Sequence, residues 1–263
     1  MIFSSSQVPS VEDTDSSSKT LSLLSWNIDG LDVKYPVERA LSVCNLIESR
    51  KPDVVFLQEI VPLTWEAITR RLKSSYSFYC EEVPSHYCHI LLIRKASNVV
   101  PQGDLQVVKF SESKQGRFLL QLLVKFHGVD VYLLTSHLES LNQNTVERKK
   151  QLKLCFELMG ELQSESGACI FAGDLNLMDR EVTQVGLPEN FVDVWEACGS
   201  DFKQKFTWDS SEPRFRLDRI YFCSENSKLQ PSRFALVGNE LLPKYKMYPS
   251  DHLGMWAEFV LKE

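Results

Sequence analysis

The sequence predicts a mixed α/β domain built from layers of sheets and helices. Apolar runs of strand length outnumber the amphipathic segments, and early in the chain the helices fall between strands. Polar side chains recur where the apolar strands end. This order favours a layered α/β domain over a helical bundle or an all-β barrel. The 263 residues, of which 43% are hydrophobic, suffice for one large domain or two small ones.

Residues 1–19 differ in composition from the rest of the chain. They are rich in Ser, with Asp, Glu and Pro, so we expect a disordered N-terminal linker and a folded domain over residues 20–263. No apolar run approaches the roughly 20 residues that span a bilayer, and no secretory signal is recognisable. Seven cysteines without a Cys-x-x-Cys pair favour a reduced, intracellular protein. The net charge of −6 neither indicates nor excludes a nucleic-acid partner, since a local basic groove can coexist with it.

The first third of the chain alternates strands with helices that open on proline. A strand is expected over 20–26 and a buried one over 53–57. Pro36 and Pro62 each stand where a helix would begin, because proline is well tolerated at the first helical position. Apolar residues follow both prolines at helical spacing, which predicts one helix after each strand.

The remainder predicts further strands and one long helix. Strands are expected over 89–93, 118–126, 129–135, 214–223 and 253–260, and the second and third form a hairpin around Gly128. A helix is expected over 146–163, with an apolar stripe of Leu152, Phe156, Met159 and Leu162.

The stretch 170–177, Ile-Phe-Ala-Gly-Asp-Leu-Asn-Leu, suggests how a strand could present polar groups. Side chains two residues apart share a face of an extended chain, so Asp174 and Asn176 would lie side by side. Gly173 would allow a substrate or a neighbouring backbone to approach closely. For this stretch alone, a strand that runs into an Asx turn is the simpler interpretation.

Comparable polar clusters follow the other predicted strands, and together they favour a metal-assisted site. Their acidic, amide and imidazole side chains are Asn27, Asp29, Glu59, His137, Asp174, Asn176, Asp218, Asp251 and His252. Oxygen donors without cysteine favour a hard cation such as Mg²⁺ or Mn²⁺ over zinc. A metal, a carboxylate base and imidazoles around one pocket suit the hydrolysis of a phosphate ester by activated water.

Each of these residues also has a structural interpretation. Glu59 could be an edge residue in a salt bridge, and His137 a structural histidine. Asp218 stands near two arginines and could form a surface ion pair worth about 0–1 kcal/mol. Trp208 and Phe222 are of residue types that more often fill a core than bind a ligand.

Six motifs, taken in order, resemble the endonuclease/exonuclease/phosphatase family. They are Trp-Asn-Ile-Asp-Gly-Leu, Leu-Gln-Glu, Ser-His-Leu-Glu-Ser, Gly-Asp-Leu-Asn, Leu-Asp-Arg-Ile and Ser-Asp-His, and the resemblance spans residues 21–260. Within the family, residues 135–140 are most similar to the branch that hydrolyses 5′-tyrosyl-DNA bonds. The resemblance implies that residues 20–263 form a catalytic domain. Its fold would be a four-layered α/β sandwich, with two packed β-sheets flanked by helices and the site at one edge between the sheets.

The resemblance also implies a role for each motif residue. Glu59 would ligate the metal, with Asp29 and Asp251 on the metal side of the site and Asn27 beside them. Asp174 would orient and deprotonate the attacking water, and Asn176 would hold water or phosphate. His252 would donate to the scissile phosphate, Asp218 would hold His252 in register, and His137 with nearby Ser140 would donate to phosphate oxygens.

The implied reaction is Mg²⁺-dependent, with Mn²⁺ as the other suitable cation, and removes a tyrosine from a DNA 5′ end. Hydrolysis would free a trapped topoisomerase tyrosine or peptide and leave a 5′-phosphate for repair. A phenol of pKa about 10 leaves more readily than a sugar alkoxide, so protonation of the leaving group is less demanding. The implied partner is a DNA end held single-stranded in a groove. We expect a monomer without membrane association, in the nucleus or also in the cytoplasm.

Two positions depart from the pattern of this branch. Met178 stands where an arginine is common, so Arg180 or Arg117 would have to steady the phosphate. The segment between Trp208 and Asp218 is short, which would leave Trp208 and Phe222 to stack beneath the terminal nucleotide.

Two alternatives remain open from the sequence. The first is another activity of the same family: an abasic-site endonuclease, a deadenylase or a phosphoinositide phosphatase. The second is a repair scaffold without activity, although a binding module would not need Glu59, Asp174, Asn176, Asp251 and His252 together.

Overall fold

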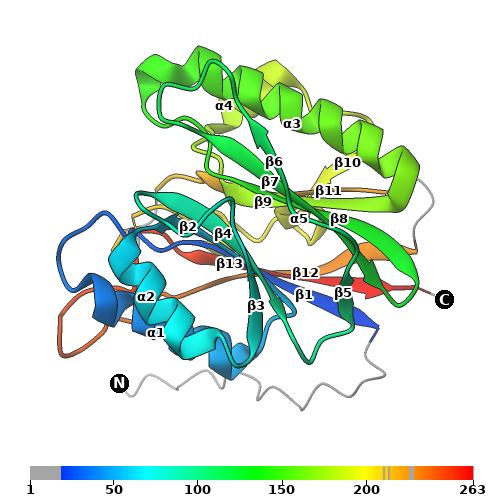
Figure 1. Ribbon diagram of the computed structural model, residues 1–263. Coiled ribbons are helices and arrows are strands. Elements are labelled where there is room, and N and C mark those ends of the chain that lie inside the picture. The colour runs from blue at the N-terminus through cyan, green and yellow to red at the C-terminus, as the bar shows by residue number, and fades with distance from the viewer. Residues whose placement is uncertain (1–18, 210, 213, 225–227, 263) are drawn as a thin grey trace, which may run out of the picture.

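The computed structural model describes residues 19–209, 211–212, 214–224 and 228–262. The predicted linker lies almost wholly outside the described residues, which begin at Lys19. The described chain forms four layers, with two β-sheets face to face and helices on both outer faces (Figure 1). The predicted four-layered α/β sandwich is therefore confirmed.

The first sheet has six strands in the order β12-β13-β1-β2-β4-β3. Strands β1 and β2 run parallel, and the other pairs are antiparallel. The bounds are Thr20–Asn27 (β1), Val54–Ile60 (β2), Tyr76–Tyr79 (β3), Cys88–Arg94 (β4), Leu229–Val237 (β12) and Gly254–Leu261 (β13).

The second sheet has seven strands in the order β10-β11-β9-β8-β7-β5, with β6 also paired to β7. Strands β8 and β9 run parallel, which mirrors the β1–β2 pair of the first sheet. The bounds are Val99–Pro101 (β5), Gln106–Lys109 (β6), Phe118–Phe126 (β7), Val129–Ser136 (β8), Gly167–Asp174 (β9), Phe191–Asp193 (β10) and Asp218–Cys223 (β11).

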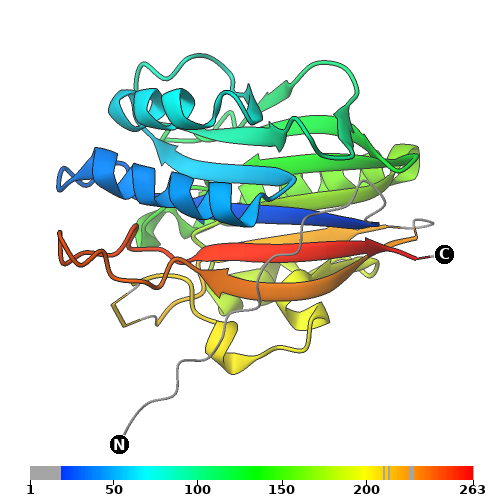
Figure 2. The same ribbon diagram turned by 90° about the horizontal axis from the view of Figure 1, so that it is seen from below.

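Helices cover the outer face of each sheet (Figures 1 and 2). Pro36–Arg50 (α1) and Pro62–Leu72 (α2) pack on the first sheet through an apolar cluster that includes Trp26, Ile47 and Ile68. Thr145–Ser166 (α3) packs on the second sheet through a cluster that includes Phe156 and Phe171. The shorter elements are Asn142–Asn144 (η1), Asp179–Val185 (α4), Val194–Ala197 (α5) and Phe202–Gln204 (η2). Within the described range, no helix is both long and apolar enough to span a membrane.

A third apolar cluster joins the inner faces of the two sheets. Phe56 and Phe259 from the first sheet belong to it, with Leu133, Ile170 and Phe222 from the second. Burial of these aliphatic and aromatic side chains on both sheets holds the two inner layers together. The parallel pairs β1–β2 and β8–β9 belong to the two facing sheets, so the polar residues at their ends can meet at one edge between the sheets.

Most predicted elements are confirmed, and the differences have local causes. β11 begins at Asp218 and not at residue 214, because Arg214 and Phe215 belong to a turn in which Phe215 bridges to Trp208. β12 was not predicted. Its Pro231 interrupts the pattern of a strand and lies where the β12–β13 register shifts.

Candidate active site

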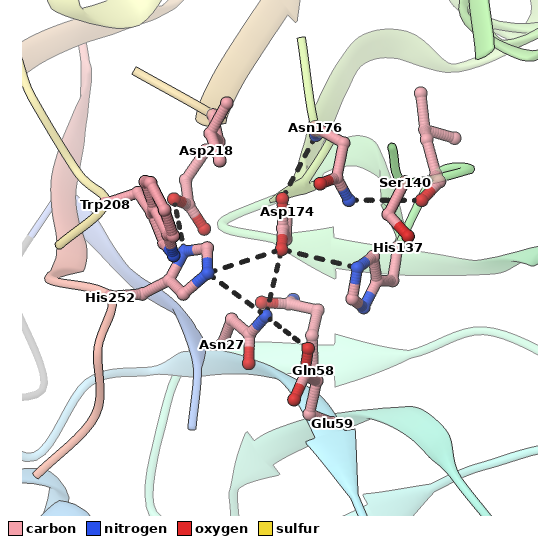
Figure 3. Close-up of polar contacts among 12 residues, drawn as sticks. Asn27, Gln58, Glu59, His137, Ser140, Asp174, Asn176, Trp208, Asp218 and His252 are labelled. Carbon is pink, nitrogen blue, oxygen red and sulfur yellow. Dashed lines mark hydrogen bonds and ion pairs between the residues drawn. The ribbon is translucent and has the colours of Figure 1, made fainter. Parts of the chain in front are cut away.

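The motif residues of the two sheets meet in a cleft of about 450 Å³. Glu59, His137, Asp174 and His252 line it, together with Tyr87 and Arg117, which come from outside the six motifs. The side chains of Glu59, His137, Asp174 and His252 point toward one another (Figure 3).

Glu59 reaches the cleft through an irregularity in β2. The β2–β4 register shifts between Leu57 and Ile60, and Glu59 lies there with a φ of 60°. Gly30 packs so tightly against this point that a Cβ atom on it would lie 2.0 Å from the Glu59 carbonyl oxygen. Burial, assisted by the charge of Asp174 and opposed by a hydrogen bond from Asn27, raises the pKa of Glu59 to about 7.

Asn27, the last residue of β1, links the two sheets. Its Nδ2 donates to Glu59 Oε1 at 3.0 Å and to Asp174 Oδ2 at 2.9 Å (Figure 3). Its Oδ1 accepts the backbone N–H of Asp29 at 2.9 Å. The amide is therefore fixed in orientation, because its donors and its acceptor are all engaged.

Asp174 ends β9 and lies at the centre of the cleft. Gly173 allows the close approach predicted from the sequence, since a Cβ atom there would lie 1.9 Å from the Ser136 carbonyl oxygen. The Oδ2 atom of Asp174 lies 3.3 Å from His137 Nε2 and 3.7 Å from His252 Nε2. Burial favours the neutral acid, but the neighbouring imidazoles, of which His252 carries the charge, and a hydrogen bond from Asn27 outweigh it and lower the pKa of Asp174. The group is thus held as a carboxylate that can orient water.

His252 and Asp218 form a buried pair on the other side of Asp174. His252 Nδ1 lies 2.8 Å from Asp218 Oδ2, and Asp218 is the cross-strand neighbour of Asp174. Burial disfavours the imidazolium, yet Asp218 and then Asp174 raise the pKa of His252 to about 10. His252 Nε2 therefore carries a proton toward the cleft at neutral pH. Ser250 and Trp26 fix the backbone of His252 by hydrogen bonds.

His137 is neutral by contrast, because burial lowers its pKa well below the ordinary value although Asp174 opposes this. The Tyr87 hydroxyl hydrogen-bonds His137 Nδ1, and Arg117 donates to the same hydroxyl. The Arg117 guanidinium also lies over the Tyr87 ring at 5.1 Å from its centroid. A cation and a hydroxyl thus stand beside His137, where a phosphate ester would find hydrogen-bond donors.

The other two predicted metal ligands lie at the rim. Asp29 Oδ2 accepts from Arg39 Nη2 at 2.6 Å, and Asp251 Oδ2 accepts from Trp208 Nε1 at 3.0 Å. Each hydrogen bond occupies one carboxylate oxygen, so the second oxygen can face a cation. Burial, and then the charge of Asp251, raise the pKa of Asp29, which indicates crowding of negative charge.

This surplus of negative charge fits a divalent cation. Among the described residues, the ligand atoms of Glu59, His137 and Asp174 lie within 4.8 Å of one another, and so do those of Asp174, Asp218 and His252. The first group opens into the cleft and offers carboxylate oxygens, which hard cations prefer. Asp29 and Asp251 belong to neither group, so their role as ligands stays a prediction.

Asn176 and Ser140 both line the cleft, and hydrogen bonds hold each of them there. The Nδ2 atom of Asn176 donates to the Leu138 carbonyl at 3.2 Å and its backbone N–H donates to Asp174 Oδ1, so Asn176 braces the site. Ser140 lines the cleft and exchanges hydrogen bonds with Gln115.

One predicted substrate contact, Phe222, is wrong, and that of Arg180 stays a prediction. Phe222 is 5% exposed and packs against Phe259 between the sheets, because both faces of β11 are buried. Arg180 lies exposed on α4 and does not line the cleft, whereas Arg117 does. Trp208 lines the cleft as predicted, and it also holds Asp251.

The sequence did not point to Tyr87, Gln115 or Arg39. Tyr87 and Gln115 lie in loops without periodicity, and Arg39 lies within an amphipathic helix. Arg39 is 2% exposed, and burial of an unassigned arginine is a signal that only the structure provides.

A four-layered sandwich whose inner sheets bring carboxylates, amides and histidines together at one edge defines a hydrolase of phosphate esters. Residues 24–252 match the endonuclease/exonuclease/phosphatase family, and the chain belongs to it. The family resemblance predicted from the six motifs is confirmed.

The similar proteins are tyrosyl-DNA phosphodiesterases. The chain is 37% identical over 263 residues to tyrosyl-DNA phosphodiesterase 2 of Homo sapiens, an alignment that covers 95% of this chain and 71% of the relative. It is 34% identical over 250 residues to the 5′-tyrosyl-DNA phosphodiesterase of Caenorhabditis elegans, covering 91% and 67%. The crystal structure of D. rerio TDP2 complexed with a single-strand DNA product superposes with a TM-score of 0.85 at 36% identity, covering 92% of this chain and 99% of that one.

Proposed function

We propose that this protein is a divalent-metal-dependent 5′-tyrosyl-DNA phosphodiesterase. The observation that carries the proposal is the convergence of Glu59, Asp174 and a protonated His252 in one cleft, in a chain similar to tyrosyl-DNA phosphodiesterases. The reaction would hydrolyse the bond between a topoisomerase tyrosine and a DNA 5′ end. The products are a free phenol and a 5′-phosphate that repair enzymes can use.

The chain's own residues account for most of the steps. Asp174, kept ionised by the charged His252 and by the hydrogen bond from Asn27, orients a water for in-line attack and accepts its proton as the new P–O bond forms. His252 Nε2–H donates to a non-bridging oxygen, where charge builds in the transition state. Arg117, held by Tyr87 beside His137, can neutralise charge on the remaining oxygens.

The cation proposed for this site is Mg²⁺, with Mn²⁺ as its substitute. Glu59 would hold it, with Asp29 and Asp251 from the rim. When bound, it would supply Lewis-acid polarisation of the phosphate.

A tyrosine leaving group suits a site that offers hydrogen-bond donors to the phosphate. A tyrosine phenolate has a pKa of about 10, so it departs without the strong general acid that a sugar alkoxide requires. Trp208, half-buried at the cleft, offers an indole face to a terminal base, and such stacking is worth about 1–3 kcal/mol per base. We infer a single-stranded DNA end as the bound form, a monomeric enzyme, and the nucleus as its place of action, with the cytoplasm as a second compartment.

A substrate panel with and without EDTA tests the proposal. A 5′-tyrosyl oligonucleotide, an abasic duplex, poly(A) and an inositol phosphate are compared with the wild-type chain and with Asp174→Asn. We expect EDTA-sensitive release of tyrosine from the first substrate only, and its loss in the variant. Preferential turnover of another substrate would support the corresponding family activity. Inactivity on all four with Mg²⁺ and Mn²⁺ would support the scaffold instead.

A further inference from the structure

Glu139 is a fully buried carboxylate that the proposed chemistry does not use. It follows β8 and belongs to the segment that carries His137 and Ser140. Its Oε1 accepts the backbone N–H of Lys114 at 2.9 Å, and its Oε2 accepts the Ser113 hydroxyl at 2.8 Å. Both donors lie in the loop 110–117 between β6 and β7. A buried carboxylate, next in sequence to the cleft-lining Ser140, thus holds a loop from elsewhere in the chain.

Gln151 of α3 completes the surroundings of this carboxylate. Its Nε2 donates to Glu139 Oε2 at 3.2 Å, while its Oε1 accepts the backbone N–H of Glu139 at 2.9 Å. The Gln151 amide cannot turn over without losing the second bond. All three groups around the carboxylate therefore donate, an arrangement that suits a carboxylate and leaves no place for a side-chain NH₂ group.

Ser113 connects Glu139 by hydrogen bonds to residues that line the cleft. Its hydroxyl oxygen accepts the backbone N–H of Arg117 at 2.7 Å and that of Gln115 at 3.3 Å. Gln115 Oε1 then accepts the backbone N–H of Ser140 at 2.7 Å and Arg117 Nη2 at 3.2 Å. Arg117, Gln115 and Ser140 all line the cleft.

We propose that Glu139 is a positioning residue, which fixes the loop 110–117 so that Arg117 and Gln115 form the wall that receives the substrate. The identity of that substrate rests on the proposed function, whereas the placement of the loop does not. A displacement of about 1 Å in a substrate-positioning group can cost about 100-fold in rate. The carboxylate therefore matters although it lies outside the reach of the phosphate.

The first test compares Glu139→Gln with a matched control. Glu139→Gln keeps the size but sets an NH₂ group against donors, while Glu112→Ala removes an exposed carboxylate of the same loop that pairs with Lys150. On a 5′-tyrosyl oligonucleotide we expect kcat/KM to fall about 10- to 100-fold in Glu139→Gln. Glu112→Ala should stay within about 2-fold of the wild type.

A double-mutant cycle and amide hydrogen exchange separate positioning from general destabilisation. In an Arg117→Ala background, Glu139→Gln should lower kcat/KM by no more than about 3-fold, because the guanidinium that Glu139 helps to position is already absent. Without substrate, Glu139→Gln should speed amide exchange in residues 111–117 and leave the strands of both sheets protected. Equal losses in the two backgrounds, or wild-type exchange in the loop, would overturn the proposal. Faster loop exchange in a chain whose wild type does not release tyrosine would overturn only the proposed function.

Discussion

Asp218→Asn is the substitution that most directly tests the electrostatics of the cleft. Asp218 and His252 are 1% and 5% exposed, and the pair is 2.8 Å apart. Burial alone would lower the pKa of His252, so the rise from 6.5 to about 10 comes from Asp218 first and Asp174 second. This difference corresponds to roughly 5 kcal/mol in favour of the imidazolium. Replacing Asp218 should reduce the proton affinity of His252 about 10- to 1,000-fold.

The consequence for activity follows from the lost donor. At pH 9 the wild-type His252 should still be mostly protonated, whereas in Asp218→Asn about half or less of it should be. The loss of one donor to a developing oxyanion typically costs about 10²–10³-fold in kcat. The pH–rate profile of the variant should therefore decline at a lower pH than that of the wild type.

Stability should change with pH in the same direction. A raised pKa stabilises the fold fully below pH 6.5, and the contribution is lost as pH rises through about 10. The wild type should thus lose stability between these values more steeply than Asp218→Asn. NMR titration of the His252 ring and urea unfolding at pH 6, 8 and 10 measure both effects. A variant whose His252 still titrates near pH 10, with a wild-type pH–rate profile, would refute this account.

Three further predictions concern the base, the cation and the core. Asp174→Asn should lower kcat of the folded enzyme about 10²–10⁴-fold, and near-wild-type turnover would exclude water activation by this residue. Glu59→Gln should weaken Mn²⁺ binding, measured by calorimetry without substrate, whereas the exposed control Glu66→Gln should not; equal affinities would remove Glu59 from the ligand set. Phe222→Ala should destabilise the fold by about 3–5 kcal/mol in urea unfolding and leave the KM of folded enzyme unchanged. A raised KM with unchanged stability would restore Phe222 to the substrate site.

The sequence predicted the centre of the site because the residues there all lie at or near the ends of predicted strands. Asn27, Glu59 and Asp174 lie at or near the ends of parallel strands, and such ends meet at one edge of each sheet. Packing two sheets face to face then brings the two sets together. The order of the motifs and the ends of the strands can both be read from the sequence, so the sequence was enough to predict that these side chains lie close together.

The residues that were missed or misplaced depend on information that the sequence lacks. Phe222 lies on β11, which is buried on both faces, and no alternation marks which face meets the other sheet. Tyr87 reaches His137 from a loop 50 residues away in the chain, and only tertiary structure sets that contact. The roles of Glu139 and Arg39 depend on burial of their charges, which the residue types alone would not suggest.

The simpler interpretation of Gly-Asp-Leu-Asn, an Asx turn, is confirmed. Asp174 Oδ1 accepts the backbone N–H of Asn176 at 3.0 Å, and Asn27 Oδ1 accepts that of Asp29 at 2.9 Å. In both turns the last residue is left-handed, with φ of 52° and 49°, a conformation that Asn and Asp tolerate best. A central strand of each sheet thus ends in the same kind of turn. The turn begins with Asn27 and ends with Asp29 in the first sheet, and begins with Asp174 and ends with Asn176 in the second. The turns leave Asn27 Nδ2 and Asp174 Oδ2 to meet across the sheets at 2.9 Å, so the two local turns position the polar groups that face each other in the cleft.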